Sequence, residues 1–417
     1  MKIHMSNVLE QAQAAKKAWR ILRRVDTASK NKFLSELERL LRAHMSDVLA
    51  ANTRDLTDNP ALSSSMRRRL TLSEESLTAM ADGVRAIAEL PDPVSEVIDS
   101  RTRPDGLRIE RVRLPIGVIA AIFESRPNII IDIAALAVKS GNAAIVRGGK
   151  EAMYSNDALY ALIREALEIA GLPHDVIQQL TDRRHEAVAE LVKLDTYVDL
   201  AIPRGGENLV RNVIDHARMP VIHHMRGMCH LYIDAAADIE KAIAITVNAK
   251  TSNPATCNSV ESILIHTAVA DTLLPRLIAA LRERGVEIHG CPRTCAKDTE
   301  CIPATEEDWA TEYLDLKVSM KVVDSFEEAL AHIERYSSGL TDGIITDNAN
   351  SAEAFFRAID SACVLVNASN RLVDGAQFGL GGEIGISTSR IHMRGPMGLA
   401  DLTTPAYRVY GNGHLRM

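Results

Sequence analysis

Short runs of β-forming residues alternate with helical patterns along most of this chain, and this alternation limits the possible folds more than any other feature. Strands that alternate with helices at this spacing form βαβ units, in which the strands are parallel. The first series of runs is GVIAAIF (117–123), AAIVR (143–147), VIQQL (176–180), VDLAI (198–202) and PVIHH (220–224). We therefore expect an α/β fold with a parallel sheet in this part of the chain.

A second series of such runs predicts a second parallel-sheet α/β domain over residues 226–378. It consists of HLYID (230–234), SVESILI (259–265), VEIHG (286–290), LKVSMKVV (316–323), GIIT (343–346) and CVLVN (363–367). Residues 1–225 form the predicted first domain, whose first ninety residues have helical patterns. The segment 379–417 is Gly-rich and then extended, and we expect it to return to the first domain.

Signals for turns and helix ends refine this outline. Residues 97–113 have two extended, charged halves around Pro104-Asp105-Gly106, which predicts a hairpin arm. We expect this arm to pair with the C-terminal tail and to exchange strands between subunits, giving a homodimer or a higher homo-oligomer. Thr71 to Glu74 fit a capping box, and Ser155 fits the N-cap of a helix that ends at Gly171.

Composition and charge exclude several classes of protein. The 417 residues carry a formal net charge of -7, so the chain has no overall basic footprint and we expect no nucleic-acid partner. No apolar run reaches the roughly 18 to 20 residues of a membrane span, and the N-terminal residues lack the apolar core of a secretory signal. We therefore expect a cytoplasmic protein with no membrane partner.

The six cysteines are too few for a disulfide framework in a chain of this length, and we expect thiols in a reducing compartment. Cys291, Cys295 and Cys301 lie near His289, but their spacing has no CxxC pair. We therefore expect no metal site.

Cys257 is the cysteine at which we expect chemistry. It lies in NAKTSNPATCN (248–258), after a helical pattern and before the apolar run VESILI. Its neighbours, Ser252 and Asn258 among them, are small and polar, which favours a thiol at a turn. Lys250, Asn258 and turn amides could stabilise a thiolate there. A small hydrophobe in a core is the alternative that the local sequence leaves open.

Three Gly- or Arg-bearing turns follow strands of the first series: FESRPNI, RGGKEA and PRGGENL. In open α/β sheets, ligands bind outside the carboxyl ends of the strands, where these turns would gather. The turns would bring Arg126, Arg147, Lys150 and Arg204 to a phosphate-bearing ligand. Surface arginines are an equally good interpretation. The chain contains neither GxGxxG nor GxxxxGK[ST], so neither a standard dinucleotide fingerprint nor a P-loop is present.

Longer blocks, in order over nearly the whole chain, resemble one family. They include ESRPNIIIDIAALAVKSGNAAIVRGGKEA, LDTYVDLAIPRGG, NAKTSNPATCNSVESILIH, TEYLDLKVSMKVV, VNASNRLVDGAQFGLGGEIGIST and RGPMGLADLTT. These blocks resemble the γ-glutamyl phosphate reductases, or glutamate-5-semialdehyde dehydrogenases, of the aldehyde dehydrogenase superfamily. The resemblance implies an aldehyde-dehydrogenase-like fold with two parallel-sheet α/β domains and a small oligomerisation arm. It also implies NADPH-dependent reduction of L-glutamate 5-phosphate to L-glutamate 5-semialdehyde with release of phosphate, the second step of proline biosynthesis from glutamate.

The resemblance also implies roles for individual residues. Cys257 would be the nucleophile that forms a thioester, and its backbone N–H with the Asn128 side chain would stabilise the oxyanion. The cofactor, NADPH or NADP, would be bound by Arg147, Lys150, Arg204, Gly205, Gly206 and Glu312, with Glu312 on the nicotinamide ribose. The substrate side would include Arg126, Lys250, Ser252 and Asn258.

The sequence departs from related families in two places. Hydrolytic aldehyde dehydrogenases carry a Glu that activates water, whereas HHMRGMCH (223–230) has no carboxylate, which would spare the thioester from water. In ALAHIERYSSGLTDGI, Leu340 and Gly343 replace the usual His and a small residue other than Gly.

Other activities stay open. A CoA-acylating aldehyde dehydrogenase also lacks the general-base Glu, and a thiol hydrolase is a weaker alternative because of the missing base. A catalytically silent scaffold, for instance for the glutamate 5-kinase that makes the acyl phosphate, belongs to a different class.

Overall fold

The computed structural model describes residues 7–416, which form two compact units. Unit 1 contains the described residues up to His223, Gly379–Gly385 and the described residues from Met397 onward. Unit 2 contains His224–Phe378 and Ile386–Pro396. The boundary after His223 lies close to the expected one at 225. The C-terminal return, expected as one segment, is divided, because β14 (Ile386–Ser387) pairs with β15 (Gly395–Pro396) inside unit 2.

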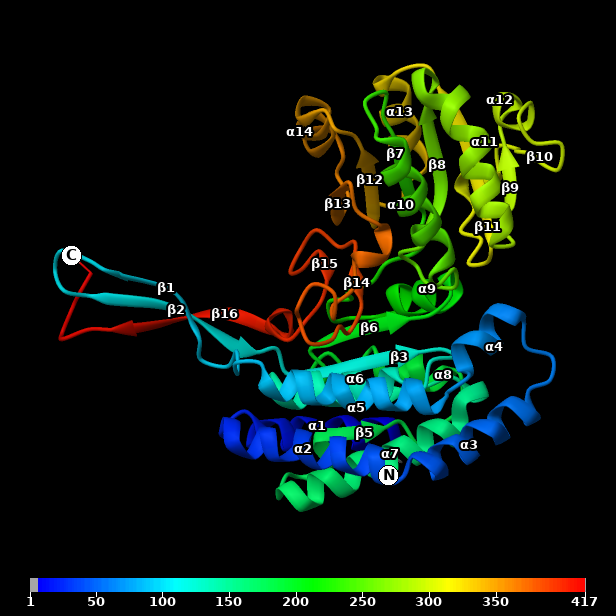
Figure 1. Cartoon of the computed structure of the whole chain (residues 1–417). Coiled ribbons are helices and arrows are strands. Elements are labelled where there is room, and N and C mark those ends of the chain that lie inside the picture. Colours follow the sequence, from blue (N-terminus) through cyan, green and yellow to red (C-terminus); the bar gives the residue numbers. More distant parts are fainter. Residues whose placement is uncertain (1–6, 417) are drawn as a thin grey trace. The chain divides into compact units, whose positions relative to one another are not determined.

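A four-stranded parallel sheet forms the centre of unit 1, in the order β5-β4-β3-β6. Strands β3, β5 and β6 are labelled in Figure 1. Its strands are β3 (Val118–Phe123), β4 (Ala143–Arg147), β5 (Ile177–Gln179) and β6 (Leu200–Arg204). Four strands of the first series are thus confirmed. The fifth, at 220–224, is wrong, because this segment forms a single bridge, Ala201 to Val221, before the chain enters unit 2.

Helices cover this sheet. They are α1 (Asn7–Leu22), α2 (Thr27–Ala43), α3 (Met45–Asp58), α4 (Ser64–Leu70), α5 (Glu74–Glu89), α6 (Ile129–Lys139), α7 (Met153–Ala170), α8 (Glu186–Leu191) and α9 (Glu207–His216), with turns η1 (Lys150–Ala152), η2 (His174–Val176) and η5 (Ala400–Leu402). The apolar face of α1, with Val8 and Ala12, packs in one core cluster with Val118 and Ala120 of β3. Burying such faces away from water is the main stabilising contribution.

Two predicted helix starts are wrong in detail. The N-cap of α5 is Ser73, and it forms a capping box with Ser76, so Thr71 lies outside the box. Helix α7 begins at Met153, and Ser155 is buried inside it, where its Oγ donates to Asp55 Oδ2 at 2.6 Å. The Ser155 hydroxyl, which the local pattern assigned to a helix cap, therefore bonds to a residue that is distant in sequence.

The predicted hairpin arm is confirmed. β1 (Val97–Thr102) and β2 (Arg108–Pro115) are antiparallel, and Gly106 in the turn has a φ of 89°. β16 (Thr403–Tyr410) of the tail pairs with the whole of β2, from Thr403 opposite Pro115 to Tyr410 opposite Arg108. These three strands extend away from the helices of unit 1, in cyan and red in Figure 1, and every residue of β1 is exposed.

Unit 2 is built on a seven-stranded parallel sheet in the order β10-β9-β11-β8-β7-β12-β13. Its strands are β7 (Cys229–Ile233), β8 (Val260–His266), β9 (Glu287–Gly290), β10 (Ile302–Pro303), β11 (Lys317–Val323), β12 (Thr341–Ile345) and β13 (Cys363–Val366). Its helices are α10 (Ile239–Thr251), α11 (Thr267–Glu283), α12 (Pro292–Cys295), α13 (Phe326–Tyr336) and α14 (Ala349–Ala358), with turns η3 (Asp308–Ala310) and η4 (Asn370–Leu372). All six predicted strands are confirmed, and only the two-residue β10 was not foreseen in this sheet.

Alternation along each central strand supplies two cores in unit 2. Leu231 and Ile263 belong to the cluster that packs with α10 and α11. Tyr232 and Leu264, their neighbours in sequence, belong to the cluster that packs with α13 and α14. A strand buried on both faces therefore reads as a continuous apolar run. Among residues 7–416, no helix has the length and apolar character needed to cross a membrane.

Candidate active site

The three predicted ligand-binding turns meet at the carboxyl edge of the unit 1 sheet, as expected. The Glu124 N–H, after β3, donates to the Arg204 carbonyl at the end of β6 at 3.0 Å. The Gly206 N–H returns a bond to Glu124 Oε2 at 2.8 Å. On the other side, the Ser125 N–H and Oγ donate to Glu151 Oε1, after β4, at 2.6 and 2.7 Å. Carboxylates of the chain itself thus bind the three turns together.

Gly205 of the Gly205-Gly206 turn lies close to the Glu124 carboxylate. A Cβ added to Gly205 would lie 2.4 Å from Glu124 Oε2. Arg204, half-buried before this turn, has its Nη2 at 3.8 Å from Glu383 Oε1. The turn therefore keeps its backbone exposed while the arginine beside it is partly neutralised within unit 1.

Arg147 and Lys150 line one small cavity at the end of β4. The cavity is lined by Arg147, Gly148, Gly149, Lys150, Met153, Asn156, Gln179, Leu180 and Arg183. Burial lowers the pKa of the half-buried Arg147, and the nearby Glu151 opposes this effect. Lys150 is exposed. Arg183 was not foreseen, although it lies in the junction between β5 and α8, and a junction between a strand and a helix is the signal that could have found it.

Asn156 of α7 gives this cavity an acceptor without a partner. Its Oδ1 is buried and makes no hydrogen bond. Gly148 lies against the same side chain, since a Cβ there would be 2.1 Å from Asn156 Nδ2. Buried polar atoms normally have a partner, so this oxygen favours a ligand that donates a hydrogen bond, such as a hydroxyl group.

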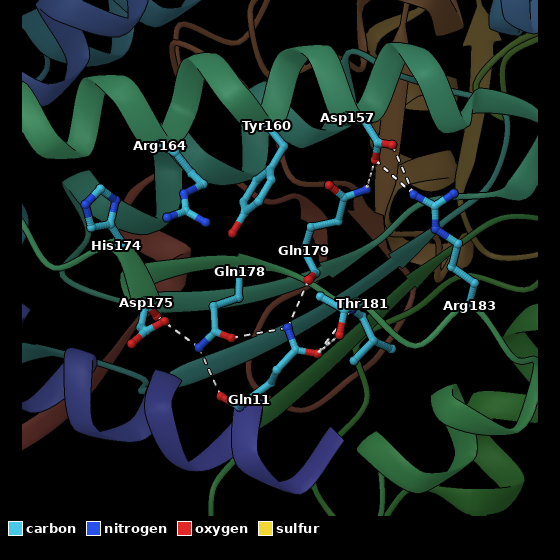
Figure 2. A pocket seen from close by; sticks show the side chains of 11 residues that line it. Gln11, Asp157, Tyr160, Arg164, His174, Asp175, Gln178, Gln179, Thr181 and Arg183 are labelled. Carbon is cyan, nitrogen blue, oxygen red and sulfur yellow. Dashed lines mark hydrogen bonds and ion pairs between the residues drawn. The ribbon is translucent and has the colours of Figure 1, made fainter. Parts of the chain in front are cut away.

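A second polar cavity, of about 390 Å³, shares Arg183 and Gln179 with the first (Figure 2). Figure 2 shows Arg183 directed to Asp157, and the ion pair between them measures 3.0 Å. Gln11 of α1 also lines this cavity, and its Nε2 donates to the Gln179 carbonyl at 3.0 Å. Several polar groups of the second cavity therefore bond to one another.

Arg126 and Asn128 lie at the start of α6, after the turn at Ser125. Ser125 has a φ of 48°, an uncommon conformation for a residue with a side chain, and Glu151 holds it. Asn128 is half-buried and its Nδ2 donates to Asp132 Oδ2 at 3.2 Å. Since an amide has two N–H donors, this contact uses one of them.

Cys257 lies in unit 2, in the loop that joins α10 to β8, and its side chain is half-buried. Its carbonyl accepts a bond from Cys229 Sγ at 3.2 Å. Gly227 closes against the same loop, because a Cβ there would lie 2.1 Å from the Cys257 carbonyl oxygen. The expected position at a turn is confirmed. Burial raises the pKa of the Cys229 thiol, so Cys229 is the poorer nucleophile.

Two expected substrate contacts near Cys257 do not fit the structure. Lys250 is fully buried and paired with Glu261 at 2.6 Å. Asn258 is buried, its Nδ2 donates to the Val373 carbonyl at 2.8 Å, and its Oδ1 accepts from Arg371. Both polar groups are therefore used inside unit 2, which corrects their assignment as direct contacts. Ser252 is exposed, and its role stays a prediction.

A signal for the buried pair was present in the sequence. Glu261 is the one carboxylate in the apolar run VESILI, and a charge in a strand that is buried on both faces must have a partner. Glu312, the expected ribose contact, is half-buried in the segment between β10 and β11.

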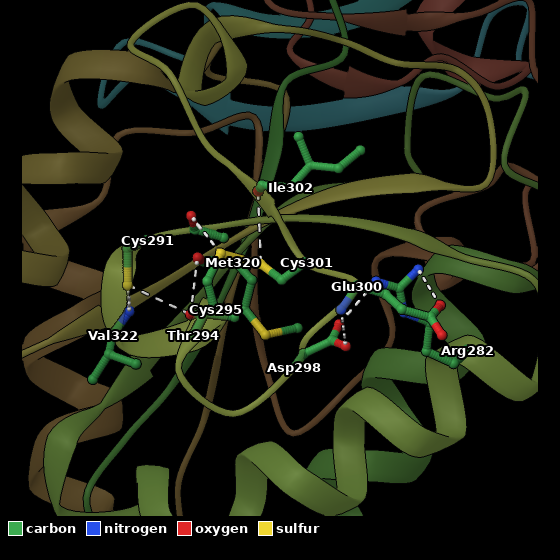
Figure 3. The surroundings of a disulfide bond; sticks show 11 residues. Arg282, Cys291, Thr294, Cys295, Asp298, Glu300, Cys301, Ile302, Met320 and Val322 are labelled. Atoms are coloured by element: carbon green, nitrogen blue, oxygen red, sulfur yellow. Dashed lines mark hydrogen bonds and ion pairs between the residues drawn. A yellow bond between two sulfur atoms is a disulfide. The ribbon is translucent and has the colours of Figure 1, made fainter.

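The cysteines near His289 differ from expectation. Cys295 and Cys301 form a disulfide, with Cα atoms 5.0 Å apart, so the expectation of thiols is wrong for this pair (Figure 3). The short helix α12 and the loop after it bring the two residues back together within six positions.

Cys291 stays a buried thiol. Burial raises the pKa of this thiol, but the hydrogen bond with Thr294 and bonds with backbone N–H groups lower it more. Across residues 7–416, no group of His, Cys, Asp and Glu side chains could hold a metal ion.

The two unusual positions after α13 are apolar in structure. Leu340 is fully buried in a cluster with Cys229, and Cys257 packs against this cluster. Gly343 lies in β12, where a Cβ would be 3.1 Å from Leu231. A histidine at position 340 would place a polar ring beside the Cys257 loop. Because residue 340 is leucine, the surface that packs against the loop there is apolar.

Comparison with known proteins supplies the family. The aldehyde dehydrogenase family model matches residues 2–295. The γ-glutamyl phosphate reductase of Moorella thermoacetica is 48% identical over 98% of both chains. The chain belongs to the γ-glutamyl phosphate reductases of the aldehyde dehydrogenase family. It is therefore an oxidoreductase, and aldehyde dehydrogenases use a nicotinamide cofactor.

Other γ-glutamyl phosphate reductases agree with this assignment. The Thermobifida fusca protein is 45% identical over 98% of this chain and 99% of its own. The crystal structure from Thermotoga maritima has a TM-score of 0.93 at 42% identity, covering 99% of this chain and 100% of that one. An acetylating aldehyde dehydrogenase from Geobacillus thermoglucosidasius has a TM-score of 0.74 at 18% identity over 98% of this chain and 97% of its own, which shows the shared fold.

Proposed function

We propose that the chain reduces L-glutamate 5-phosphate to L-glutamate 5-semialdehyde with NADPH and releases phosphate, the second step of proline biosynthesis from glutamate. One observation carries this proposal: Cys257 lies at a half-buried turn in a chain that is 48% identical over 98% of its length to a γ-glutamyl phosphate reductase. Cys257 is half-buried, whereas Cys229 is fully buried.

The Cys257 thiolate would attack the acyl phosphate carbon, and the C–O bond to phosphate would break, leaving a thioester on Sγ. When bound, NADPH supplies the hydride that reduces such a thioester. Collapse of the resulting thiohemiacetal breaks the C–S bond, releases the aldehyde and returns the thiolate. No base is needed, which agrees with the absence of a carboxylate from residues 223–230.

Two donors are proposed for the oxyanion that develops at each addition. One is the Cys257 backbone N–H and the other is the second N–H of the Asn128 amide. The contact to Asp132 supports this role for Asn128, because it orients the amide.

Cofactor binding is proposed at the turns of unit 1 and at Glu312 of unit 2. The cations Arg147, Lys150 and Arg183 at the end of β4 suit the extra phosphate of NADPH, and the unpartnered Asn156 Oδ1 suits a ribose hydroxyl. Arg204, Gly205 and Gly206 would contact the pyrophosphate or the nicotinamide. Arg126 and Ser252 are the residues proposed to contact the substrate.

The reverse reaction tests the proposal. Purified protein is given glutamate 5-semialdehyde and NADP, with and without inorganic phosphate, and the absorbance of reduced cofactor is followed. We expect reduction that depends on phosphate, exceeds that with NAD and disappears in Cys257→Ser. Reduction that requires CoA and yields acyl-CoA would instead show a CoA-acylating aldehyde dehydrogenase.

We further propose a cytoplasmic enzyme that forms at least a homodimer through the arm. Val97, Tyr407 and Val409 on the arm are exposed apolar residues, as a strand exchanged between subunits requires. Deleting residues 97–113 should give monomers in light scattering.

A glutamate 5-kinase that hands over the labile acyl phosphate is the proposed protein partner, and co-sedimentation with it is the test.

A further inference from the structure

A fully buried ion pair closes the base of the loop that carries Cys257. Lys250 lies in the last turn of α10 and Glu261 is the second residue of β8, so the two residues flank the loop. Lys250 Nζ lies 2.6 Å from Glu261 Oε2, and both side chains are 0% exposed. The Ser259 Oγ adds a bond to the Ala249 carbonyl at 3.2 Å across the same base. The loop is therefore fixed to the sheet at both of its ends.

The same carboxylate holds a second segment. Glu261 Oε1 accepts the Leu314 N–H at 3.3 Å. Leu314 has a φ of 53°, a conformation that a leucine rarely adopts unless its surroundings impose it. It lies two residues after Glu312. One buried side chain thus connects the Cys257 loop with the segment that carries Glu312.

Stability alone does not explain such a pair. Removing two charges from water costs about as much as their attraction returns, and well-packed apolar residues of similar size are often equally stable. Burial raises the pKa of Glu261 to about 8 and lowers that of Lys250, while each opposes the shift of the other. An apolar pair could fill the space, but it could not accept the Leu314 N–H.

We propose that Lys250 and Glu261 are positioning residues, whose pair fixes the Cys257 loop and the Glu312 segment relative to each other in the arrangement that hydride transfer needs. This inference rests on the proposed roles of Cys257 and Glu312. Neither Lys250 nor Glu261 touches a reacting atom. Their effect is exerted through the geometry of the two segments, and a misplacement of about 1 Å can reduce a rate about a hundredfold.

Two double variants separate positioning from stability. Lys250→Met with Glu261→Met removes both charges and the acceptor for Leu314, whereas Lys250→Met with Glu261→Gln keeps an acceptor. We expect both to melt close to the wild type, because neither leaves an unpaired buried charge. The Met/Met variant should lose about 10- to 100-fold in kcat and bind NADPH about 10-fold more weakly in a fluorescence titration. The Met/Gln variant should recover NADPH affinity to within about threefold.

A matched control comes from unit 1, where Lys30 and Asp92 form a similar pair at 2.8 Å with side chains 2% and 11% exposed. Lys30→Met with Asp92→Met should leave kcat and NADPH affinity within about twofold of wild type, whatever it does to the melting temperature. If the Lys250/Glu261 Met/Met variant matches wild type in kcat and NADPH affinity, the inference is overturned.

Two further variants complete the test. Should the Met/Met variant fail to fold, Glu261→Asp retains the charge but withdraws the carboxylate by one methylene. A fivefold or greater loss of NADPH affinity supports the inference, and unchanged affinity contradicts it. Failure of the proposed function is recognised separately, because the wild-type protein, with Lys250 and Glu261 intact, would then show no phosphate-dependent reduction of NADP.

Discussion

Lys150 in unit 1 and Lys250 in unit 2 show how similar local sequences lead to different roles. Lys150 follows the Gly148-Gly149 turn after β4, and Lys250 lies in the last turn of α10. Lys150 is exposed on a turn that lines a cavity. Lys250 is fully buried and paired with Glu261. A lysine at a surface turn can meet an anionic ligand, whereas a lysine in a buried pair organises the chain around it.

The same contrast extends to the two regions. The candidate cofactor side of unit 1 consists of backbone turns at strand ends with cations projecting from them. The Cys257 side of unit 2 consists of a loop held by buried bonds. We therefore expect substitutions in unit 1 to change ligand affinity, and substitutions around Cys257 to change reaction rate or stability.

The largest expected effect is that of Cys257→Ser. Without a base to activate it, a hydroxyl is a far poorer nucleophile than a thiolate, so turnover should fall at least about a thousandfold. The melting temperature should change little, because serine fills nearly the same volume. Cys301→Ser, which breaks the Cys295–Cys301 disulfide by removing one half-buried sulfur, is the control and should keep most of its activity. Substantial turnover in Cys257→Ser would exclude the covalent route.

Lys250→Met and Lys150→Met test the contrast between the two lysines directly. Breaking a buried pair leaves Glu261 without its partner, so Lys250→Met should lower the free energy of unfolding by about 3 to 5 kcal/mol. Lys150→Met should change it by less than about 0.5 kcal/mol, since Lys150 is exposed. Urea unfolding of both variants gives the comparison, and equal losses would refute it.

His332 makes the stability of unit 2 depend on pH. It is buried against Trp309 and Tyr336, and burial lowers its pKa from 6.5 to about 3. Below pH 6.5, His332 binds a proton in the unfolded chain but stays neutral in the folded chain. The free energy of unfolding therefore falls as the pH falls. Near pH 4.5 the loss should reach about 2 to 3 kcal/mol.

The variant His332→Phe should remove that part of the pH dependence of unfolding. Substitution of the exposed His185 by Gln should leave the dependence unchanged. An identical slope in wild type and His332→Phe would show that another group is responsible.

Arg147→Ala and Arg183→Ala should weaken NADPH binding about 10- to 30-fold each, because each removes a charge-assisted bond of about 1.5 to 2 kcal/mol. NADH binding, measured in the same fluorescence titration, should change by less than about threefold. Arg184→Ala is the neighbouring control, since Arg184 pairs with Asp182 and Glu190. Equal losses for both cofactors would assign the two arginines to the shared part of the cofactor.

The smallest expected effect is that of Arg126→Ala, which should raise the KM for the acyl phosphate about fivefold and leave kcat nearly constant. The reason is that Arg126 lies half-buried beside Asn128, where it would meet the phosphate of the substrate. Steady-state kinetics with Arg101→Ala, on the exposed strand of the arm, provides the comparison. An unchanged KM would remove Arg126 from the site.

Local patterns were sufficient wherever a residue's neighbours in sequence decide its structure. The apolar run 259–265 became a central strand because residues buried on both faces are apolar at every position. Gly106 and Gly171 marked a turn and a helix end, because both positions have a left-handed backbone. Cys257 was singled out because the small polar residues on either side favour a turn over a core position.

Only the tertiary structure decided what distant partners do to a residue. Ser155 lost its expected capping role because Asp55 lies within hydrogen-bonding distance, and the run at 220–224 stayed a single bridge because the chain there crosses into unit 2. Lys250 forms a buried ion pair because Glu261, in the next strand, lies beside it. The sequence by itself determined the order of strands and helices and the position of the thiol, since these depend on short-range patterns. Which charges are buried, and which are left for a ligand, depends on contacts that exist only after the chain has folded.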